Sequence, residues 1–463
     1  MNARLAALAA RMDQLQEYER EPVAPDKFQS ARQFAGLFAG EHVAATEFVI
    51  GAFFVLHGVS LGDLLIGLFA GNLLAVSSWT FVCAPLATRT RLTLYWYFRR
   101  IGGPGLMGLY NVLNGVLFCV LAGAMISVSA TAVAALFGLP SPGLEELLPS
   151  SAAWAALAFL IGIAFTVIAI LGFEKLSRFA VVCSPWMLAI FVGCAIAVLP
   201  QLGVRSDFSN LWEVAATRIW NGQATPGQEK FGLWHVMFFA WFCNLAMHIG
   251  LSDMALFRFA PDWKYGLLSA CGMFPGHLLA WICSGILVAA IQREMNPGLM
   301  AIEAGGLAGG AAVMIAGWTT ANPTLYRAGL AFQSVTPNWS RWKTTALAGI
   351  VTTMLACLPV FFLRLLDYVA IYGLLLMPVG AMVFAEHWIF PKLGLEQYGA
   401  ERRQQAVNWR ALGVWIATLA FCYFLPLHLF FRWLPGYLFA LAGYTATCAW
   451  TREPAAVAAR GAR

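Results

Sequence analysis

One apolar segment in the second half of the chain carries an unusual group of polar residues. The segment GWTTANPTLYRAGLAFQ covers residues 317–333 and contains two adjacent threonines, an asparagine, a proline and an arginine. On a helix, Ala316, Thr319 and Thr320 share one face, because residues three and four apart are neighbours. Pro323 has no N–H to donate to the carbonyl of Thr319. Hydroxyl and carbonyl oxygens are the ligands of small hard cations, so the segment is a candidate cation site, although threonine also bonds its own helix.

A second candidate site contains a carboxylate. Glu47 lies about 14 residues into the first apolar run, or roughly 21 Å at 1.5 Å per residue, and Gly51 follows one turn later. Ionisable side chains at that depth are costly and mark functional sites. We expect an interrupted helix here that binds a cation, a proton or a cationic substrate. The alternative is that the helix begins later and Glu47 faces an aqueous vestibule.

A third candidate site lies in residues 233–259. Asn244, His248 and Ser252 recur every four residues and share one helix face until the geometry changes near Gly250. An interrupted helix exposes backbone groups that are tolerated only against a cavity or protein, and such interruptions hold substrates in secondary transporters. Hydrogen bonding between helices is the alternative role for Asn244 and His248.

Three other side chains are candidates for substrate contact. Trp241 and Phe242 can stack on a flat ligand, although aromatic residues in such helices also serve as packing. Asn322 can bind substrate or join neighbouring helices through its amide.

The composition identifies the class of protein that must position these residues. The chain has 463 residues, of which 60% are hydrophobic and 11% charged, with a mean hydropathy of +0.70. Its apolar runs of about 20 residues match a hydrocarbon core of roughly 30 Å, which indicates an all-α polytopic membrane protein. The predicted spans are 34–56, 61–84, 104–137, 152–172, 177–199, 232–252, 264–291, 304–329, 344–363, 367–390, 408–424 and 429–449.

The distribution of basic residues predicts the orientation. With a cytoplasmic N-terminus, the twelve spans leave 23 of the 29 Lys and Arg residues inside, with Arg327 as the marker of a cytoplasmic helix end. The positive-inside rule therefore predicts that both termini are cytoplasmic and that the protein lies in the plasma (inner) membrane. We expect residues 1–33 to form an amphipathic cytoplasmic tail and residues 450–463 a second tail.

Other function classes lack their motifs. The ten cysteines all lie in apolar segments without a CxxC pair, which favours small buried side chains over metal or disulfide roles. The chain has no HExxH and no Gly-rich phosphate loop with lysine, so we expect no enzyme activity and no cofactor other than a coupling ion. A channel is disfavoured because the polar positions do not repeat. The basic residues are spread over loops, which predicts no nucleic-acid partner.

Several blocks of sequence resemble the nucleobase–cation symporter-1 family, the permeases of cytosine, purines, hydantoin and allantoin. GWTTANPTLYRAGLAFQSV followed by RWKTTALAGIVTTMLACLPVF resembles helices 8 and 9 of that family. The other blocks are GVSLGDLLIGLFAGN (58–72), GFEKLSRFAVVCSP (172–185), SDMALFRF (252–259) and LMPVGAMVFAEHWI (376–389). They occur in the family's order between about residues 40 and 390.

The resemblance implies a LeuT-like architecture of twelve transmembrane helices. Residues 34–390 would form a ten-helix core of two inverted five-helix repeats, 34–199 and 232–390, and residues 391–449 would add two helices. Substrate would lie between helices 1, 3, 6 and 8. Sodium-coupled relatives take ligands from helix 8, which here match Ala316, Thr319 and Thr320, and from helix 1 carbonyls near Glu47 and Ile50.

This chain departs from the family pattern at the substrate site. Helix 3 has no tryptophan, so Phe118 and, one turn earlier, Asn114 are its candidates, and Glu47 is acidic. We therefore predict a secondary active symporter for a nucleobase-like or related nitrogen heterocycle, driven by sodium or protons. The alternative is a cationic amine-type or pyrimidine-vitamin substrate recognised through Glu47. The substrate, the coupling ion and the oligomeric state stay open.

Overall fold

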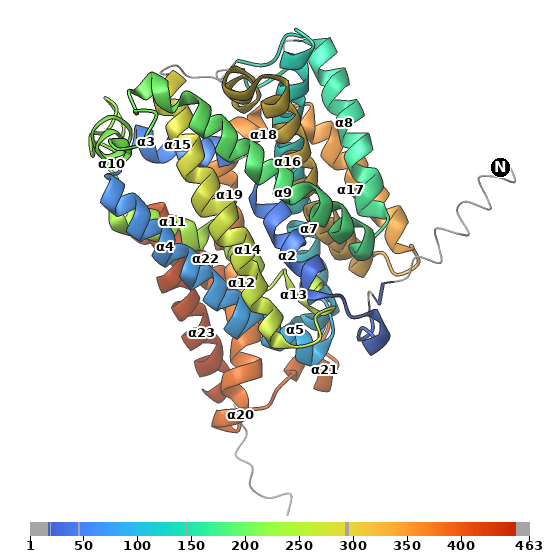
Figure 1. Cartoon of the computed structure of the whole chain (residues 1–463). Coiled ribbons are helices and arrows are strands. Elements are labelled where there is room, and N and C mark those ends of the chain that lie inside the picture. The colour runs from blue at the N-terminus through green and yellow to red at the C-terminus, as the bar shows by residue number, and fades with distance from the viewer. Residues whose placement is uncertain are drawn as a thin grey trace, which may run out of the picture.

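The chain folds into a bundle of helices (Figure 1). The computed structural model describes residues 17–18, 20–44, 47–143, 146–149, 151–291 and 296–450. Among these residues the only β-type pairing is an isolated bridge between Ser60 and Asn221. About half of the predicted amphipathic N-terminal tail, residues 1–16 and 19, and nearly all of the predicted C-terminal tail, residues 451–463, lie outside the described residues.

The first five predicted spans correspond to helices of the first half of the chain. They are α2 (Ala31–His42) with α3 (Glu47–Leu56), α4 (Leu61–Ser78) with η2 (Trp79–Cys83) and α5 (Ala84–Thr90), α7 (Arg99–Leu136), α8 (Ala152–Ile170), and α9 (Phe173–Val198). The short α6 (Leu94–Tyr97) precedes α7, and α10 (Leu211–Val214) lies in the long connection to the second half.

The second half repeats this order and adds two helices. It contains α11 (Leu233–Phe242) with α12 (Leu245–His248) and α13 (Met254–Phe257), η5 (Trp263–Ser269) with α14 (Ala270–Gly272), η6 (Met273–Leu278) and α15 (Leu279–Ile291), α16 (Pro297–Val335), α17 (Arg341–Ala356) with α18 (Val360–Leu363), and α19 (Leu365–Phe384) with η7 (Ala385–Ile389) and α20 (Phe390–Leu393). After α21 (Gly399–Arg402) come α22 (Trp409–Phe424) and α23 (Trp433–Trp450), which lie to one side of the bundle in Figure 1.

The helices are built for an apolar environment. Seven helices in the described part of the chain are long and apolar enough to cross a membrane. The other predicted spans are interrupted, such as α2 with α3, or less apolar, such as α23. The two longest helices, α7 and α16, pack along one another at the centre, and α9 packs on α16. Polar pairs such as Asn111 Nδ2 to Ser334 Oγ at 2.6 Å join α7 to α16.

The first helix of each half is interrupted, as predicted. α2 ends at His42, where the chain turns through Val43 (φ −93°, ψ 59°), and α3 begins at Glu47. In the second half the helix stops twice. Asn244 (φ −112°, ψ 23°) separates α11 from α12, six residues before the predicted point, and Leu251 takes a left-handed conformation (φ 66°) just after Gly250.

Gly51, predicted to lie at the substrate site, instead packs α3 against α15. A Cβ atom there would lie 2.3 Å from the carbonyl oxygen of Trp281 and 2.5 Å from Cβ of Ser284. We expect Gly51→Ala to lower the melting temperature of the purified protein, because overpacking a tight contact costs about 1–3 kcal/mol. Gly413→Ala is the matched control, since no atom lies within 4 Å of its added methyl group. Equal melting temperatures for the two variants would contradict this packing role.

Candidate functional site

A cavity of about 60 Å³ lies where the interrupted helices meet the centre of the bundle. Its wall is formed by residues on both sides of the α2–α3 interruption, by α7, by α11 and the turn that follows it, and by η6, α16 and α19. The polar and aromatic residues of this wall are Glu41, His42, Glu47, Phe239, Asn244, His277, Thr320, Thr324 and Tyr372. We call this space the central cavity.

Glu47 is the acidic residue of the wall with an oxygen free to bind a ligand. It is the first residue of α3, where the N-terminal end of a helix favours a negative charge, and it is 3% exposed. Its Oε1 lies 3.7 Å from Nε2 of His277. Its Oε2 is buried and has no hydrogen-bond partner in the described part of the chain. A buried carboxylate oxygen without a partner is costly, so Glu47 is poised to accept a hydrogen bond from a ligand or to bind a cation.

His277 is a wall residue that sequence reasoning missed. It stacks on Trp281 at 4.6 Å between ring centroids and meets the ring of His42 edge-on at 4.9 Å. Asn244, a predicted substrate residue, also lines the cavity, and its Nδ2 lies 3.5 Å from Nε2 of His277. The sequence did contain a signal for His277, because it is an ionisable residue inside an apolar run. The same rule selected Glu47.

The aromatic residues of the wall are Phe239 and Tyr372, not the predicted Trp241 and Phe242. Trp241 points away from the cavity, because its Nε1 donates to Ser78 Oγ at 3.0 Å. Its ring contacts Trp433 of α23 at 4.5 Å. Phe242 is buried outside the wall and packs against Phe430 at 6.1 Å.

Two predicted residues of α7 stand behind Tyr372 rather than in the wall. The Tyr372 hydroxyl donates to Asn114 Oδ1 at 3.1 Å, and Asn114 Nδ2 donates to Ser252 Oγ at 3.4 Å. Phe118 meets the Tyr372 ring edge-on at 5.3 Å. Asn114 and Phe118 therefore orient the Tyr372 ring.

His248 and Asn322 also lie outside the wall of the central cavity. The ring nitrogen Nε2 of His248 is 2.9 Å from the carbonyl oxygen of Trp241. Both amide atoms of Asn322 are buried without a hydrogen-bond partner in the described part of the chain.

The predicted cation ligands on α16 converge on the end of α2. Thr320 Oγ1 lies 2.9 Å from the carbonyl oxygen of Ala316 and 3.1 Å from that of Glu41, and Thr319 Oγ1 lies 3.1 Å from the Ala316 oxygen. Helix 1 contributes the carbonyl of Glu41 here. The family pattern implied that helix 1 carbonyls near Glu47 and Ile50 would bind the cation. These two residues line the central cavity. Both hydroxyls donate to the Ala316 carbonyl of their own helix, which is the alternative role of threonine, and the C-terminal end of α2 adds the negative end of a helix dipole beside these four oxygens.

A buried ion-pair cluster lies next to these threonines. Arg327 Nη1 lies 2.5 Å from Glu41 Oε1, and Arg327 Nη2 lies 2.5 Å from Asp253 Oδ1. Trp79 Nε1 donates to Asp253 Oδ2 at 2.6 Å. The prediction that Arg327 marks a cytoplasmic helix end is wrong, because α16 continues to Val335 and Arg327 is fully buried.

Comparisons with known proteins place the fold. No protein-family model and no curated protein sequence matches the chain. Among solved structures, Mhp1, a nucleobase-cation-symport-1 family transporter in a closed conformation with bromovinylhydantoin bound, matches with a TM-score of 0.72 and 18% identity, over 94% of this chain and 96% of that chain. A Na⁺-coupled sialic acid symporter matches with a TM-score of 0.68 and 15% identity, over 96% and 97% of the two chains. MhsT in complex with L-phenylalanine matches with a TM-score of 0.58 and 16% identity, over 89% and 99%.

The comparisons confirm the predicted fold class. The chain is an all-α polytopic membrane protein with the LeuT-like architecture of these transporters, and the resemblance inferred from the sequence blocks holds at the level of the fold.

Proposed function

We propose that this chain is a secondary active symporter of a small nitrogen heterocycle. Its fold is shared with transporters, one of which is a nucleobase-cation-symport-1 family member. The observation that carries the proposal is the free carboxylate oxygen of Glu47 beside a cavity enclosed by two interrupted helices. Ring N–H groups and exocyclic amines are donors that a carboxylate binds strongly. Phe239 and Tyr372 supply aromatic surfaces, and Asn244 supplies an amide.

The size of the central cavity supports alternating access. Its volume of about 60 Å³ is well below the roughly 300–1,000 Å³ of most ligand pockets, so we expect the surrounding helices to move apart when a heterocycle enters. The interrupted helices α2–α3 and α11–α12 supply the mobile joints, and a site at the middle of the membrane opens in turn to each side. We place the protein in the plasma membrane with both termini cytoplasmic, on the distribution of its basic residues.

The coupling ion in this proposal is sodium, bound by oxygen atoms of two elements. Thr319, Thr320 and the carbonyl of Ala316 come from α16, and the carbonyl of Glu41 comes from α2. A cation there joins the end of α2 to α16, so its binding favours the arrangement in which the central cavity is formed. Proton coupling through Glu47 and His277, 3.7 Å apart, is the competing mechanism.

A cationic amine-type or pyrimidine-vitamin substrate is the second candidate, and the buried charges favour it. Glu41 and Asp253 pair with the guanidinium of Arg327, and Glu47 is a third buried carboxyl group, in the wall of the central cavity. If all three carboxyl groups are ionised, Arg327 and a bound sodium ion neutralise two of the three negative charges. A cationic substrate would neutralise the third. Buried charge is costly unless paired. Cation–π contact with Phe239 or Tyr372 would add to the binding of such a substrate.

The proposal is tested by binding and uptake. Purified protein is screened by thermal shift against nucleobases, hydantoins, pyrimidine vitamins and amines, with sodium or choline as the cation, since a ligand of the native state raises the melting temperature. Compounds that bind are then radiolabelled and offered to proteoliposomes under an inward sodium gradient or an inward proton gradient. Uptake above equilibrium under either gradient supports symport, and equilibration without accumulation under both contradicts it.

The threonine pair separates the two coupling mechanisms. We expect the double variant Thr319→Ala/Thr320→Ala to lose the sodium dependence of substrate binding, because two of the four oxygens are removed, and we expect a sodium affinity at least tenfold lower. Substrate binding is measured by isothermal calorimetry at increasing sodium. Thr445→Ala is the control, since that hydroxyl bonds only the carbonyl of Leu441 in its own helix, at 2.7 Å. Unchanged sodium dependence in the double variant would refute the threonine pair as the sodium site, and sodium-independent binding by the wild type would leave protons as the driving ion.

A further inference from the structure

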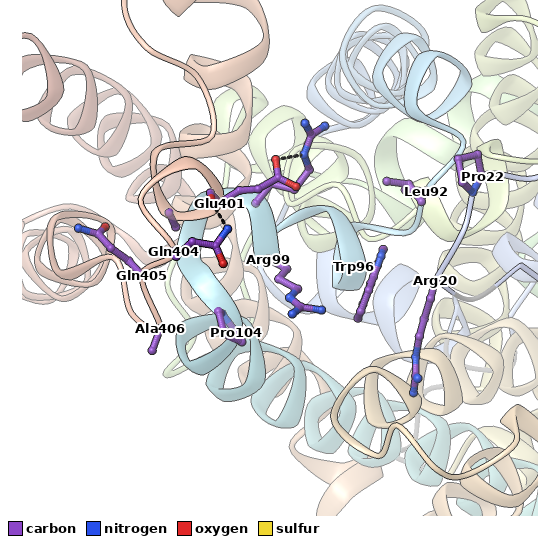
Figure 2. A pocket seen from close by; sticks show the side chains of 12 residues that line it. Arg20, Pro22, Leu92, Trp96, Arg99, Pro104, Glu401, Gln404, Gln405 and Ala406 are labelled. Carbon is purple, nitrogen blue, oxygen red and sulfur yellow. Dashed lines mark hydrogen bonds and ion pairs between the residues drawn. The ribbon is translucent and has the colours of Figure 1, made fainter.

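Two adjoining cavities lie at the end of the bundle where α7 begins, away from the central cavity. The first, of about 540 Å³, is shown in Figure 2, and the second has about 630 Å³. Both are lined by Arg20, Trp96, Arg99 and Pro104. Loops predicted to be cytoplasmic meet here, because the wall also includes Gln404 between α21 and α22 and Pro337 after α16. We call this pair of cavities the arginine cleft.

Two guanidinium groups flank one tryptophan in the arginine cleft. Cζ of Arg99 lies 5.0 Å from the ring centroid of Trp96, and Cζ of Arg20 lies 5.8 Å from it. Figure 2 shows the three side chains beside one another. Cation–π contact holds a guanidinium in place without consuming its N–H donors, so the donors of Arg99 stay available for an anion.

In the described part of the chain, no carboxylate forms an ion pair with either of these two arginines. Arg99 is exposed and has no hydrogen bond or ion pair with any residue that the structure describes. Arg20 donates to the carbonyl oxygens of Pro337 at 2.9 Å and Gln333 at 3.0 Å, and its Nε is buried without a partner. The acidic residue of the wall, Glu401, is already paired with Arg100 at 2.9 Å. Among the residues that the structure describes, the arginine cleft therefore carries two positive charges without a carboxylate partner.

An apolar strip leads from the arginine cleft along the side of α7. Leu109 and Val112 line the second cavity, and with Val116 they recur at helical spacing. They are 48%, 42% and 47% exposed. Because α7 is one of the helices apolar enough to cross a membrane, this strip faces acyl chains. A positive site thus lies directly at the foot of a surface that contacts lipid tails.

We propose that the arginine cleft binds the phosphate group of an anionic phospholipid. The guanidinium group of Arg99 offers paired N–H donors to the phosphate oxygens, and Arg20, on the other side of the Trp96 ring, adds a second positive charge. Trp96 lies at headgroup level, as tryptophan does at membrane interfaces, and an acyl chain runs along Leu109 and Val112. Basic pockets between transmembrane helices bind anionic headgroups in this way. The lipid joins the N-terminal segment, the start of α7 and the end of α16, and so stabilises their packing.

The proposal is tested on full-length protein washed free of lipid in detergent. Melting temperature is measured against increasing dioleoylphosphatidylglycerol, dioleoylphosphatidylcholine and sodium phosphate. We expect phosphatidylglycerol to raise the melting temperature and the other two to have little effect at equal concentration. An equal shift with phosphatidylcholine would show that the charge is not recognised, and an equal shift with sodium phosphate would show that the ligand is a soluble anion. Either result overturns the proposal.

Arg99→Gln is the decisive variant, because it removes one charge from an exposed side chain that bonds no other described residue. We expect its half-saturating concentration of phosphatidylglycerol to rise about tenfold, with the melting temperature in the absence of lipid unchanged. Arg32→Gln is the matched control, since Arg32 is exposed near the start of α2 and lies outside both cavities. Native mass spectrometry counts the phosphatidylglycerol molecules retained by each variant. Equal retention by Arg99→Gln and the wild type would refute the site.

Discussion

Replacing Glu47 with glutamine is expected to weaken substrate binding about 10- to 100-fold. The variant keeps the size of the side chain but removes the negative charge at the wall of the central cavity. A hydrogen bond to a charged group contributes about 1.5–3 kcal/mol, and each 1.4 kcal/mol corresponds to a factor of ten in affinity. The measurement is the dissociation constant of the best ligand from the thermal-shift screen, determined by calorimetry at saturating sodium.

The pattern of loss distinguishes the candidate substrates and mechanisms. If only cationic ligands are lost, the amine-type substrate is correct. If the binding of neutral heterocycles is lost as well, the carboxylate binds ring N–H groups. If accumulation under a proton gradient is lost while binding is retained, Glu47 carries the coupled proton. Glu213→Gln, at an exposed residue of α10, controls for the loss of one charge. Wild-type binding and uptake by Glu47→Gln would refute the role of this residue in the site.

The architecture was predictable because the membrane constrains it strongly. Long apolar runs can only span the bilayer, and a carboxylate such as Glu47 in one of them is costly enough to require a local reason. The interruptions beside Glu47 and Gly250 follow from that requirement. The gathering of Glu47, Ile50, Asn244 and Thr320 around one cavity agrees with the family pattern, while their roles in binding stay predictions.

The aromatic residues of the site were not predictable in the same way. Periodicity assumes a regular helix of 3.6 residues per turn, but the chain unwinds at Asn244, only two residues after α11 ends. The face of α11 that lines the cavity therefore carries Phe239. Trp241 lies on another face and contacts α4 and α23. His277 received no weight, although its position inside an apolar run is the same signal that selected Glu47.

Contacts between residues far apart in the sequence could not be predicted from sequence patterns either. Glu41 and Arg327 are 286 residues apart, and nothing in either segment identifies the other as its partner. Arg327 was assigned to a helix end because arginine is usually found there. Only the packing of α2 against α16 reveals that its charge is neutralised inside the protein.

Replacing Arg327 with methionine is expected to destabilise the protein by about 3–5 kcal/mol, the cost of breaking a buried ion pair from one side. Methionine fills much of the space of the arginine stem but leaves the carboxylates of Glu41 and Asp253 buried without their cation. The cluster joins α2, the segment after α12, and α16, so its loss should loosen the helices that carry the central cavity. The measurement is the melting temperature in detergent together with the yield of monodisperse protein.

The triple variant Glu41→Gln/Asp253→Asn/Arg327→Met separates charge from packing. It removes all three charges at similar volume, so no charge is left buried without its partner, which is the main cost of breaking a buried ion pair from one side. We expect it to recover most of the melting temperature lost by Arg327→Met alone. Arg432→Met, at a residue that bonds loop carbonyls such as that of Leu427 at 2.8 Å, is the control for arginine loss. If the triple variant is as unstable as Arg327→Met, the guanidinium acts by packing. If the triple variant is stable but no longer binds substrate, the cluster holds α2 in the position that completes both the sodium site and the central cavity. The reason is that Glu41 belongs to both: its carbonyl contacts Thr320, and its carboxylate binds Arg327.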